Sequence, residues 1–226
     1  MNVVAVVPAL DEGASIGACL APLVREATRV ILVDAGSRDD TPARAAASGA
    51  SVLSAPRGRA SQMNAGARAA GDAEVLVFVH ADTLLPRGWR EAIEHALGRG
   101  ARWGRFDVRL DSGRPLLRVV EATMNARSRL TGICTGDQAI FVRRDAWLAS
   151  GGYAPIALME DIEFSRRLGR THGRPACLGL PVLVSARRWE RDGALRTIAL
   201  MWLLRAMYFF GASPQTLHDL YYGRRG

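Results

Sequence analysis

The residues best suited to chemistry end an apolar segment, residues 75–82, which reads Val-Leu-Val-Phe-Val-His-Ala-Asp. A short apolar run of this kind is typical of a buried strand, and open α/β sheets bind ligands beyond the carboxyl ends of their strands. A carboxylate at that place can hold Mg²⁺ or Mn²⁺, which proteins bind through one or two side chains together with substrate phosphates. Asp82 is therefore the first candidate metal ligand and His80 the second, although imidazole suits softer metals.

Three further groups of polar residues follow predicted strands: Pro8–Glu12, Asp34 and Arg57–Asn64. In a parallel sheet these groups meet His80 and Asp82 at one edge. Carboxylates there can accept hydrogen bonds from a ribose or a base. The arginines of the third group can bind a diphosphate, helped by the helix N-terminus that follows them. A solvated loop is the alternative for these arginines.

Two common nucleotide-binding motifs are absent from the sequence. The first turn after a strand reads Pro-Ala-Leu-Asp-Glu-Gly, which lacks the glycine pattern that cradles the pyrophosphate in dinucleotide-binding folds. There is also no Walker A sequence, the loop that cradles phosphates in many nucleotide hydrolases. We therefore expect a nucleotide whose phosphates are held through a metal.

The predicted elements that position these residues alternate between strand and helix. Apolar patterns predict strands at 3–7, 29–33, 51–55, 74–79, 103–111, 138–143 and 181–185, and helices at 15–27, 42–48, 61–70, 87–99, 115–130, 146–150 and 162–170. The alternation requires an α/β fold with a mainly parallel sheet flanked by helices. We expect one domain over residues 1–190 and an apolar helical appendage of the same domain over 191–226.

The composition limits the class of protein. With 226 residues, 49% of them hydrophobic, the chain can form a sizeable core. Its net charge of +8 predicts anionic partners, and the scattered arginines disfavour nucleic acid. Three cysteines without metal or disulfide spacing indicate reduced thiols, Cys19, Cys134 and Cys177, in a cytoplasmic protein. The N-terminus reads as a strand, not as a signal peptide.

The segment Leu195–Gly211 is apolar almost all round. Arg196 and Arg205 interrupt it and leave no uncharged stretch long enough for a transmembrane helix. One alternative is a helix lying in the interface at the inner face of the membrane. The other is a helix buried against the domain or against a second subunit.

Five motifs together, in this order, resemble the family 2 glycosyltransferases of the GT-A fold: Val-Pro-Ala-Leu-Asp-Glu, Val-Asp-Ala-Gly-Ser-Arg-Asp-Asp-Thr, Asn-Ala-Gly, His-Ala-Asp and Met-Glu-Asp-Ile-Glu-Phe. The resemblance covers residues 1–190. It is greatest to small bacterial members associated with radical-SAM or selenium-domain proteins. It implies transfer of a sugar from a nucleotide-diphosphate sugar, with UDP the commoner carrier in the family, to a small-molecule or lipid-linked acceptor. It also implies Mg²⁺ or Mn²⁺ as cofactor.

The resemblance implies roles for single residues. Asp82 would hold the cation that bridges the diphosphate, and His80, where the family usually has Asp, would contact the ribose, the sugar or the metal. The other implied donor contacts are to the base (Pro8, Ala9 and Glu12), the base or ribose (Asp34), the nucleotide (Arg59 and Asn64), the sugar hydroxyls (Asp137 and Gln138) and the diphosphate (Arg188). For Asp137 and Gln138 a plain turn before a strand is the alternative. His172 is a lesser candidate for a further metal ligand.

Glu160 and Asp161 open a predicted helix in the place where inverting members of the family carry the catalytic base. The resemblance thus implies that Asp161 removes the proton from the acceptor hydroxyl, with Glu160 beside it. Acidic residues at a helix start also complement the helix dipole, which is the structural alternative.

Two rivals remain at this point. A nucleotidyltransferase would need a glycine- and arginine-rich signature directly after the first strand, which Ala9–Gly13 does not supply. A degenerate fold that acts as a binding module would not need Asp34, Asp82 and Asp161, all of which are present.

Overall fold

Four parallel strands carry the strand-end residues, in the spatial order β3-β2-β1-β4. They are β1 (Val3–Ala9), β2 (Arg29–Asp34), β3 (Ser51–Ser54) and β4 (Val75–Phe78). The computed structural model describes residues 1–223. Because Ala9 pairs with Asp34 and Asp34 with Ser54, the ends of β1, β2 and β3 lie level along one edge.

The sheet continues beyond β4 with β7 (Phe141–Arg143), β6 (Trp103–Asp111), β8 (Ala176–Ser185) and β5 (Thr83–Leu84). β7 runs antiparallel to both of its neighbours and β5 antiparallel to β8, whereas β6 and β8 are parallel. The described sheet is therefore mainly parallel, as predicted.

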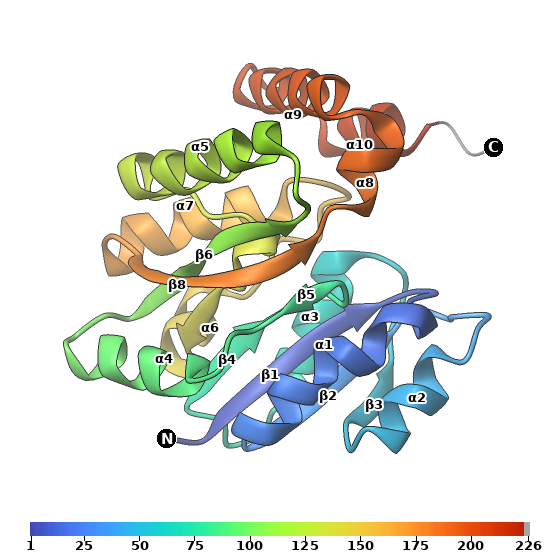
Figure 1. Ribbon diagram of the computed structural model, residues 1–226. Helices are drawn as coiled ribbons and strands as arrows, with labels where there is room; N and C mark the ends of the chain where they lie inside the picture. Colours follow the sequence, from blue (N-terminus) through green and yellow to red (C-terminus); the bar gives the residue numbers. More distant parts are fainter. Residues whose placement is uncertain (224–226) are drawn as a thin grey trace.

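Helices cover both faces of the sheet (Figure 1). Alternate residues of β1 divide between two cores, as expected for a strand buried on both faces. Val3, Ala5 and Val7 face α1 (Gly13–Glu26), α4 (Trp89–Gly98) and α5 (Pro115–Thr131), while Val4 and Val6 face α3 (Arg59–Ala69), α6 (Arg144–Ser150) and α7 (Glu160–His172). The short α2 (Thr41–Ala47) packs beside α1.

The structure corrects several predicted boundaries. β1 extends through Pro8. The proline is tolerated in the strand because β4 pairs with β1 only as far as Val6, so no hydrogen bond to β4 needs the N–H that proline lacks. The predicted strand 138–143 begins instead as a 3₁₀ turn, η1 (Gly136–Gln138), which the Gln138 side chain caps. β8 starts at Ala176 and passes through a bulge before Pro181. The two-residue β5 was not predicted.

After β8 the chain forms α8 (Arg187–Asp192), which spans the predicted start of the appendage at residue 191, then α9 (Ala194–Phe209) and the unpredicted α10 (Pro214–Tyr222). Leu204 of α9 and Leu217 of α10 form a small core with Leu158, Met159 and Ile162, at the start of α7. The appendage therefore packs on the segment that carries Glu160 and Asp161. The last three residues of the predicted appendage, 224–226, lie outside the described residues. None of the helices among residues 1–223 combines the length and apolar character needed to cross a bilayer.

Candidate active site

Asp82 follows β4, and its carboxylate has few hydrogen-bond partners. The one hydrogen-bonding contact of this carboxylate in the described residues is Thr83 Oγ1 at 3.5 Å, which is too long for a strong bond. The pKa of Asp82 is raised, because burial together with the charges of Asp137 and Glu12 outweighs the opposing charges of His80 and Arg59. A half-buried carboxylate in such a setting is stabilised by an added cation.

His80 is held against the loop of η1. Its Nδ1 lies 3.2 Å from Asp137 Oδ1. A Cβ added to Gly136 would come within 2.3 Å of its Nε2. Burial acts to raise the pKa of Asp137, but the hydrogen bond and charge of His80 and the charge of Arg59 lower it overall. Both ring nitrogens thus face the η1 loop, which favours a positioning role for His80 over metal ligation.

Asp161 lies in the first turn of α7 with its carboxylate oriented by backbone groups. Oδ2 accepts a hydrogen bond from Gly136 N at 2.8 Å, and Oδ1 accepts one from Ile162 N at 2.7 Å. Asp161, Glu160, Gly136 and His80 line one small pocket at the end of the sheet. The structure therefore brings the predicted base and His80 to the same pocket.

Glu160 is only 4% exposed. Burial and the neighbouring charge of Asp161 raise the pKa of Glu160 to about 7, so near neutral pH it is partly protonated. Met159, which precedes the pair, has a φ of 71°, a left-handed conformation uncommon for residues other than glycine. This turn places the two adjacent carboxylates at the start of α7.

Arg59 begins α3 and faces the same region from the other side. Desolvation opposes its charge, yet Tyr222, Glu160, Tyr221 and Asp137 act together to raise the pKa of Arg59. Arg188 does not reach out freely: its guanidinium stacks 3.7 Å from the ring centroid of Tyr221 and also donates to the hydroxyl of that residue. Its contact with a diphosphate stays a prediction.

The ends of β1 and β2 are joined by a residue that the sequence reading missed. Gln62 of α3 is buried, and its Nε2 donates to Ala9 O at 3.0 Å and to Val33 O at 2.8 Å. Beside these strand ends, Asp34 accepts hydrogen bonds from Gly36 N at 2.9 Å and Ser37 N at 3.1 Å. The signal that could have revealed Gln62 is a polar residue on the apolar face of a helix.

The N- and C-terminal parts of the chain meet at Glu12. Its Oε2 accepts from Ser15 Oγ at 2.8 Å and pairs with Arg187 at 3.1 Å. Pro8 and Ala9 are buried in β1 directly before this residue. The segment predicted to bind a base, Pro8–Glu12, is therefore joined to α8 by the ion pair between Glu12 and Arg187.

Three predicted site residues have other positions or partners. Gln138 is fully buried; its Oε1 accepts from Thr135 N at 3.1 Å and its Nε2 donates to Ser128 Oγ at 2.9 Å, so it supports the loop and does not face a sugar. The amide of Asn64 is engaged by Tyr153 N and O, at 2.9 and 2.8 Å. His172 ends α7, about 16 Å along the helix from Asp161, too far to share a metal with Asp82 at this pocket.

Among residues 1–223, no group of three or more His, Cys, Asp or Glu side chains is arranged to hold a metal ion. A cation at Asp82 would therefore take most of its ligands from water or a bound substrate. Mg²⁺ sites that use one or two carboxylates plus phosphates have this character.

The sequence profile of glycosyl transferase family 2 matches residues 4–148. The chain belongs to this family. None of the curated proteins compared with it is significantly similar in sequence. The match to this glycosyltransferase family includes the strand ends, Asp82 and Asp137 but stops before Glu160 and Asp161.

Solved structures share the fold of this glycosyltransferase. Glucosyl-3-phosphoglycerate synthase from Mycobacterium tuberculosis, with Mn²⁺, UDP and glucosyl-3-phosphoglycerate, matches with a TM-score of 0.62 at 20% identity, over 90% of this chain and 78% of that chain. The same enzyme with Mg²⁺ and UDP matches with a TM-score of 0.61 at 20% identity, over 80% and 69%. With Mn²⁺ and UDP-glucose it gives 0.58 at 22% identity, over 90% and 78%.

Proposed function

We propose that this glycosyltransferase moves a sugar from a UDP-sugar to an acceptor hydroxyl with inversion, using a divalent cation at Asp82 and Asp161 as general base. The observation that carries the proposal is the oriented carboxylate of Asp161 in one pocket with His80, two residues before Asp82. UDP and Mg²⁺ or Mn²⁺ are suggested by the structures of the synthase, which contain them.

The residues present fit a hard cation. Asp82 has a raised pKa and one weak contact, 3.5 Å from Thr83 Oγ1, and oxygen ligands suit Mg²⁺ and Mn²⁺. When bound, such a cation neutralises charge on the departing diphosphate. Arg59 adds a fixed positive charge on the same side, since its charge acts on Asp82. His80 would orient Asp137 toward the sugar rather than ligate the metal.

Asp161 performs the proton transfer in this proposal. The acceptor oxygen forms a bond to the anomeric carbon while the bond from that carbon to the diphosphate oxygen breaks, and the hydroxyl proton passes to Asp161. The two backbone N–H groups that bind its carboxylate fix its direction. Attack from the side of Asp161, opposite the diphosphate, inverts the anomeric centre.

Calorimetric titration with UDP and GDP, each with and without Mn²⁺, tests the donor half of the proposal. We expect UDP to bind in a Mn²⁺-dependent manner and Asp82→Asn to lose that dependence. If neither nucleotide binds, or if nucleotide affinity is the same with and without Mn²⁺, the donor half of the proposal is contradicted.

Hydrolysis of a UDP-sugar separates an enzyme from a binding module. Asp161→Asn keeps the size of the side chain but removes the base, so we expect hydrolysis to fall about 100-fold or more with UDP affinity unchanged. Glu163→Gln is the matched control, because Glu163 lies on the same helix and pairs with Arg167 instead. Equal hydrolysis by wild type and Asp161→Asn would remove Asp161 from the role of base. A nucleotidyltransferase would instead join UTP to a sugar 1-phosphate and release pyrophosphate from the UTP, so a parallel assay with those two substrates tests that rival.

A further inference from the structure

Two arginines near Asp161 lack the partners that buried cations normally have. Arg127 of α5 donates through Nη1 to Ile133 O at 3.2 Å, but its Nε and Nη2 are buried without a partner among the described residues. Arg205 of α9 is half-buried, and in the described part of the chain Asp161 and Asp137 influence it through their charge alone. Buried guanidinium groups without partners are costly.

The fold brings these two arginines to the base from different elements. Ile133, which Arg127 binds, packs against the small core that contains Leu204, next in sequence to Arg205. The same loop continues to Gly136, whose N–H binds Asp161. Burial and the charge of Arg205 lower the pKa of Arg127, and burial lowers that of Arg205. Two like charges are thus held close together, with the single charge of Asp161 acting on both.

The arginine pair and Arg59 differ in one of their charged neighbours. Arg59 influences Asp82, the residue proposed for the diphosphate side, whereas the charge of Asp161 acts on Arg127 and Arg205; Asp137 is influenced by both Arg59 and Arg205. An acceptor must approach the base. A negative group on the acceptor would therefore meet the pair, while the donor diphosphate meets Arg59.

We propose that Arg127 and Arg205 bind an anionic group of the acceptor, a phosphate or a carboxylate, close to the hydroxyl that Asp161 deprotonates. The inference rests on the proposed function and names the acceptor class for that site. Guanidinium groups bind such anions through paired, charge-assisted hydrogen bonds. An anion between the two arginines would also offset their mutual repulsion.

Inorganic phosphate is the probe that tests this site. We expect it to bind the protein by calorimetry after saturation with UDP and Mn²⁺, because the donor then fills the Arg59 side. Arg205→Gln and Arg127→Gln should each weaken phosphate binding about tenfold or more, with UDP affinity unchanged. Arg196→Gln, an exposed arginine on the same α9, is the matched control and should bind phosphate like wild type.

Three outcomes would overturn the assignment: phosphate that UDP displaces, phosphate that does not bind, and equal affinity in the two variants and wild type. If UDP itself fails to bind, the donor proposal fails separately, and the phosphate titration without UDP still tests the arginine pair. Thermal melting separates binding from misfolding. Loss of one of two repelling charges should leave the melting temperature of Arg205→Gln equal to that of wild type or above it.

A second, independent observation is an exposed apolar surface on the outer side of α5 and α9. We call it the apolar face and define it by the large residues that are more than half exposed on these helices and directly after α9: Val119, Leu130, Leu195, Trp202, Leu203, Phe209 and Phe210. Trp202 is 62% and Phe210 85% exposed. Five of the exposed positions on α9, 195, 199, 202, 206 and 209, recur at helical spacing and are apolar, while Arg196 is exposed beside them.

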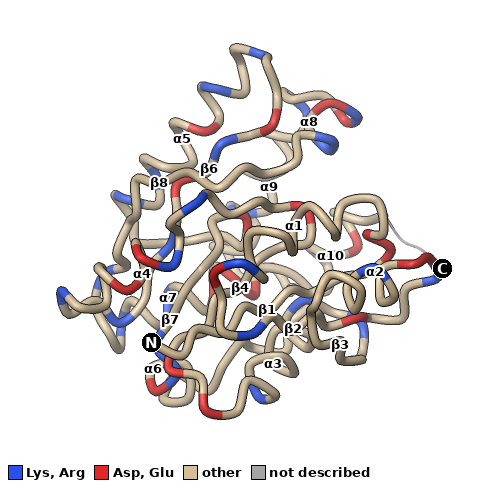
Figure 2. The backbone as a smooth tube through the Cα atoms, turned by 60° about the horizontal axis from the view of Figure 1, so that its bottom comes forward, with Lys and Arg blue, Asp and Glu red and all other residues tan. Residues whose placement is uncertain are grey.

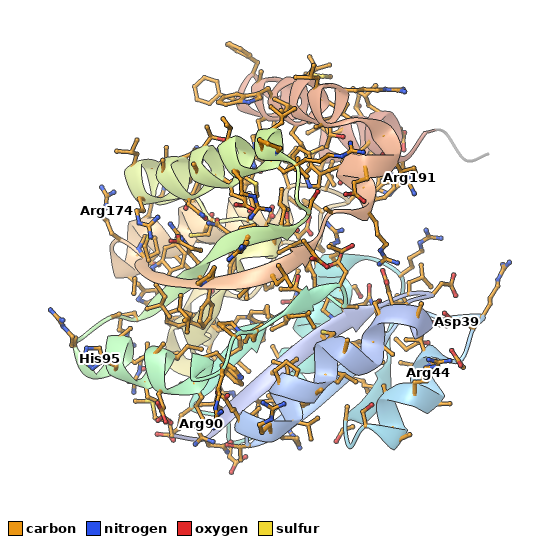
Figure 3. The ribbon with its side chains drawn as sticks, viewed as in Figure 1. Asp39, Arg44, Arg90, His95, Arg174 and Arg191 are labelled. Atoms are coloured by element: carbon orange, nitrogen blue, oxygen red, sulfur yellow. The ribbon has the colours of Figure 1, made fainter. Side chains whose placement is uncertain are left out.

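The two helices lie on the same side of the molecule (Figure 1), and Figure 3 shows side chains projecting outward from α9. Ala194 and Ile198 of α9 pack against the core that contains Leu117 and Val120 of α5, so their outward sides form a common surface. Contiguous exposed apolar surface of this kind marks an interaction site.

The charge around the apolar face favours an anionic partner. Residues 114–131 and 187–210, which include α5, α8 and α9, contain five exposed arginines and one exposed carboxylate: Arg114, Arg129, Arg187, Arg191 and Arg196, and Glu190. Basic residues mark α5 and α8 in Figure 2, and Arg191 of α8 is exposed beside the C-terminal helices (Figure 3). A second copy would bring the same positive surface to the contact and be repelled.

We infer that the apolar face docks on a membrane surface rich in anionic lipid headgroups. Trp and Phe side chains would enter the boundary between headgroups and acyl chains, while the surrounding arginines bind the headgroups. This chooses the interfacial alternative for Leu195–Gly211 and adds α5 to it. The inner side of α9, with Leu204, remains packed on the domain.

Cosedimentation with vesicles of phosphatidylglycerol and of phosphatidylcholine tests the inference. We expect binding to the former that falls with added salt, and little binding to the latter. The double variant Trp202→Gln, Phe209→Gln should bind phosphatidylglycerol about tenfold more weakly or worse. Leu148→Gln, at a leucine that is 57% exposed on α6, is the matched control.

Absence of binding to phosphatidylglycerol, or equal binding by the double variant and wild type, would overturn the membrane assignment. So would a dimer in analytical ultracentrifugation that the double variant abolishes, because a second copy would then cover the apolar face.

Discussion

Glu160 makes the stability of the folded protein depend on pH. Its pKa rises from 4.5 to about 7 through burial and the charge of Asp161. A carboxyl whose pKa is raised on folding binds more protons in the folded state, so its contribution to stability is present at low pH and is lost as the pH rises toward 7. Each pKa unit corresponds to about 1.4 kcal/mol, so Glu160 alone should remove about 2–3 kcal/mol of stability between pH 5 and pH 8.

Urea unfolding at several pH values measures this effect. Glu160→Gln removes the titrating group and keeps its shape, so its free energy of unfolding should lack the fall that the wild type shows, and near pH 8 it should exceed the wild type by about 3 kcal/mol. Glu163→Gln controls for the loss of an acidic residue at the start of the same helix. Parallel pH profiles for wild type and Glu160→Gln would refute the reasoning, because the raised pKa would then be absent.

Three further predictions concern residues around the site. Gln62→Leu should cost about 2 kcal/mol in urea unfolding, because two carbonyls at the ends of β1 and β2 lose their donor; an unchanged midpoint would contradict it. Gly136→Ala should weaken UDP binding in calorimetry, since its Cβ would displace His80, whereas Gly179→Ala has open space and should bind normally. With a thiol reagent at pH 8, Cys177 of the folded protein should react quickly, whereas Cys19 and Cys134 should react slowly because burial raises the pKa of each of these two thiols to about 12.

The local pattern predicted the order of elements well. The strand at 103–111 matches β6 at both ends, and most predicted helices differ from the observed ones by one or two residues. Where the observed elements differ from the predicted ones, long-range contacts are the cause. β5 has two residues and exists only through its pairing with β8. The first residue of the predicted strand 138–143 instead belongs to a 3₁₀ turn, which the side chain of Gln138 caps.

The candidate site divides in the same way. Asp82 and His80 could be named from sequence because they follow a predicted strand, and Asp161 because of the family resemblance; the structure places Asp161 and His80 in one pocket. Gln138 and Asn64 could not be judged in that way. Whether a side chain faces a ligand or a neighbouring backbone depends on which segment packs against it, and their partners are Ser128 and Tyr153.

The sequence by itself determined the mainly parallel arrangement of the strands and the gathering of polar residues at their ends, because short apolar runs, their alternation with helices and abrupt polar strand ends can all be seen in the local sequence. Only the tertiary structure decided what surrounds Asp161. Arg127 and Arg205 come from α5 and α9 and meet there because Leu204 and Leu217 pack on the start of α7. The same packing turns one side of α9 inward and leaves its apolar outer side exposed.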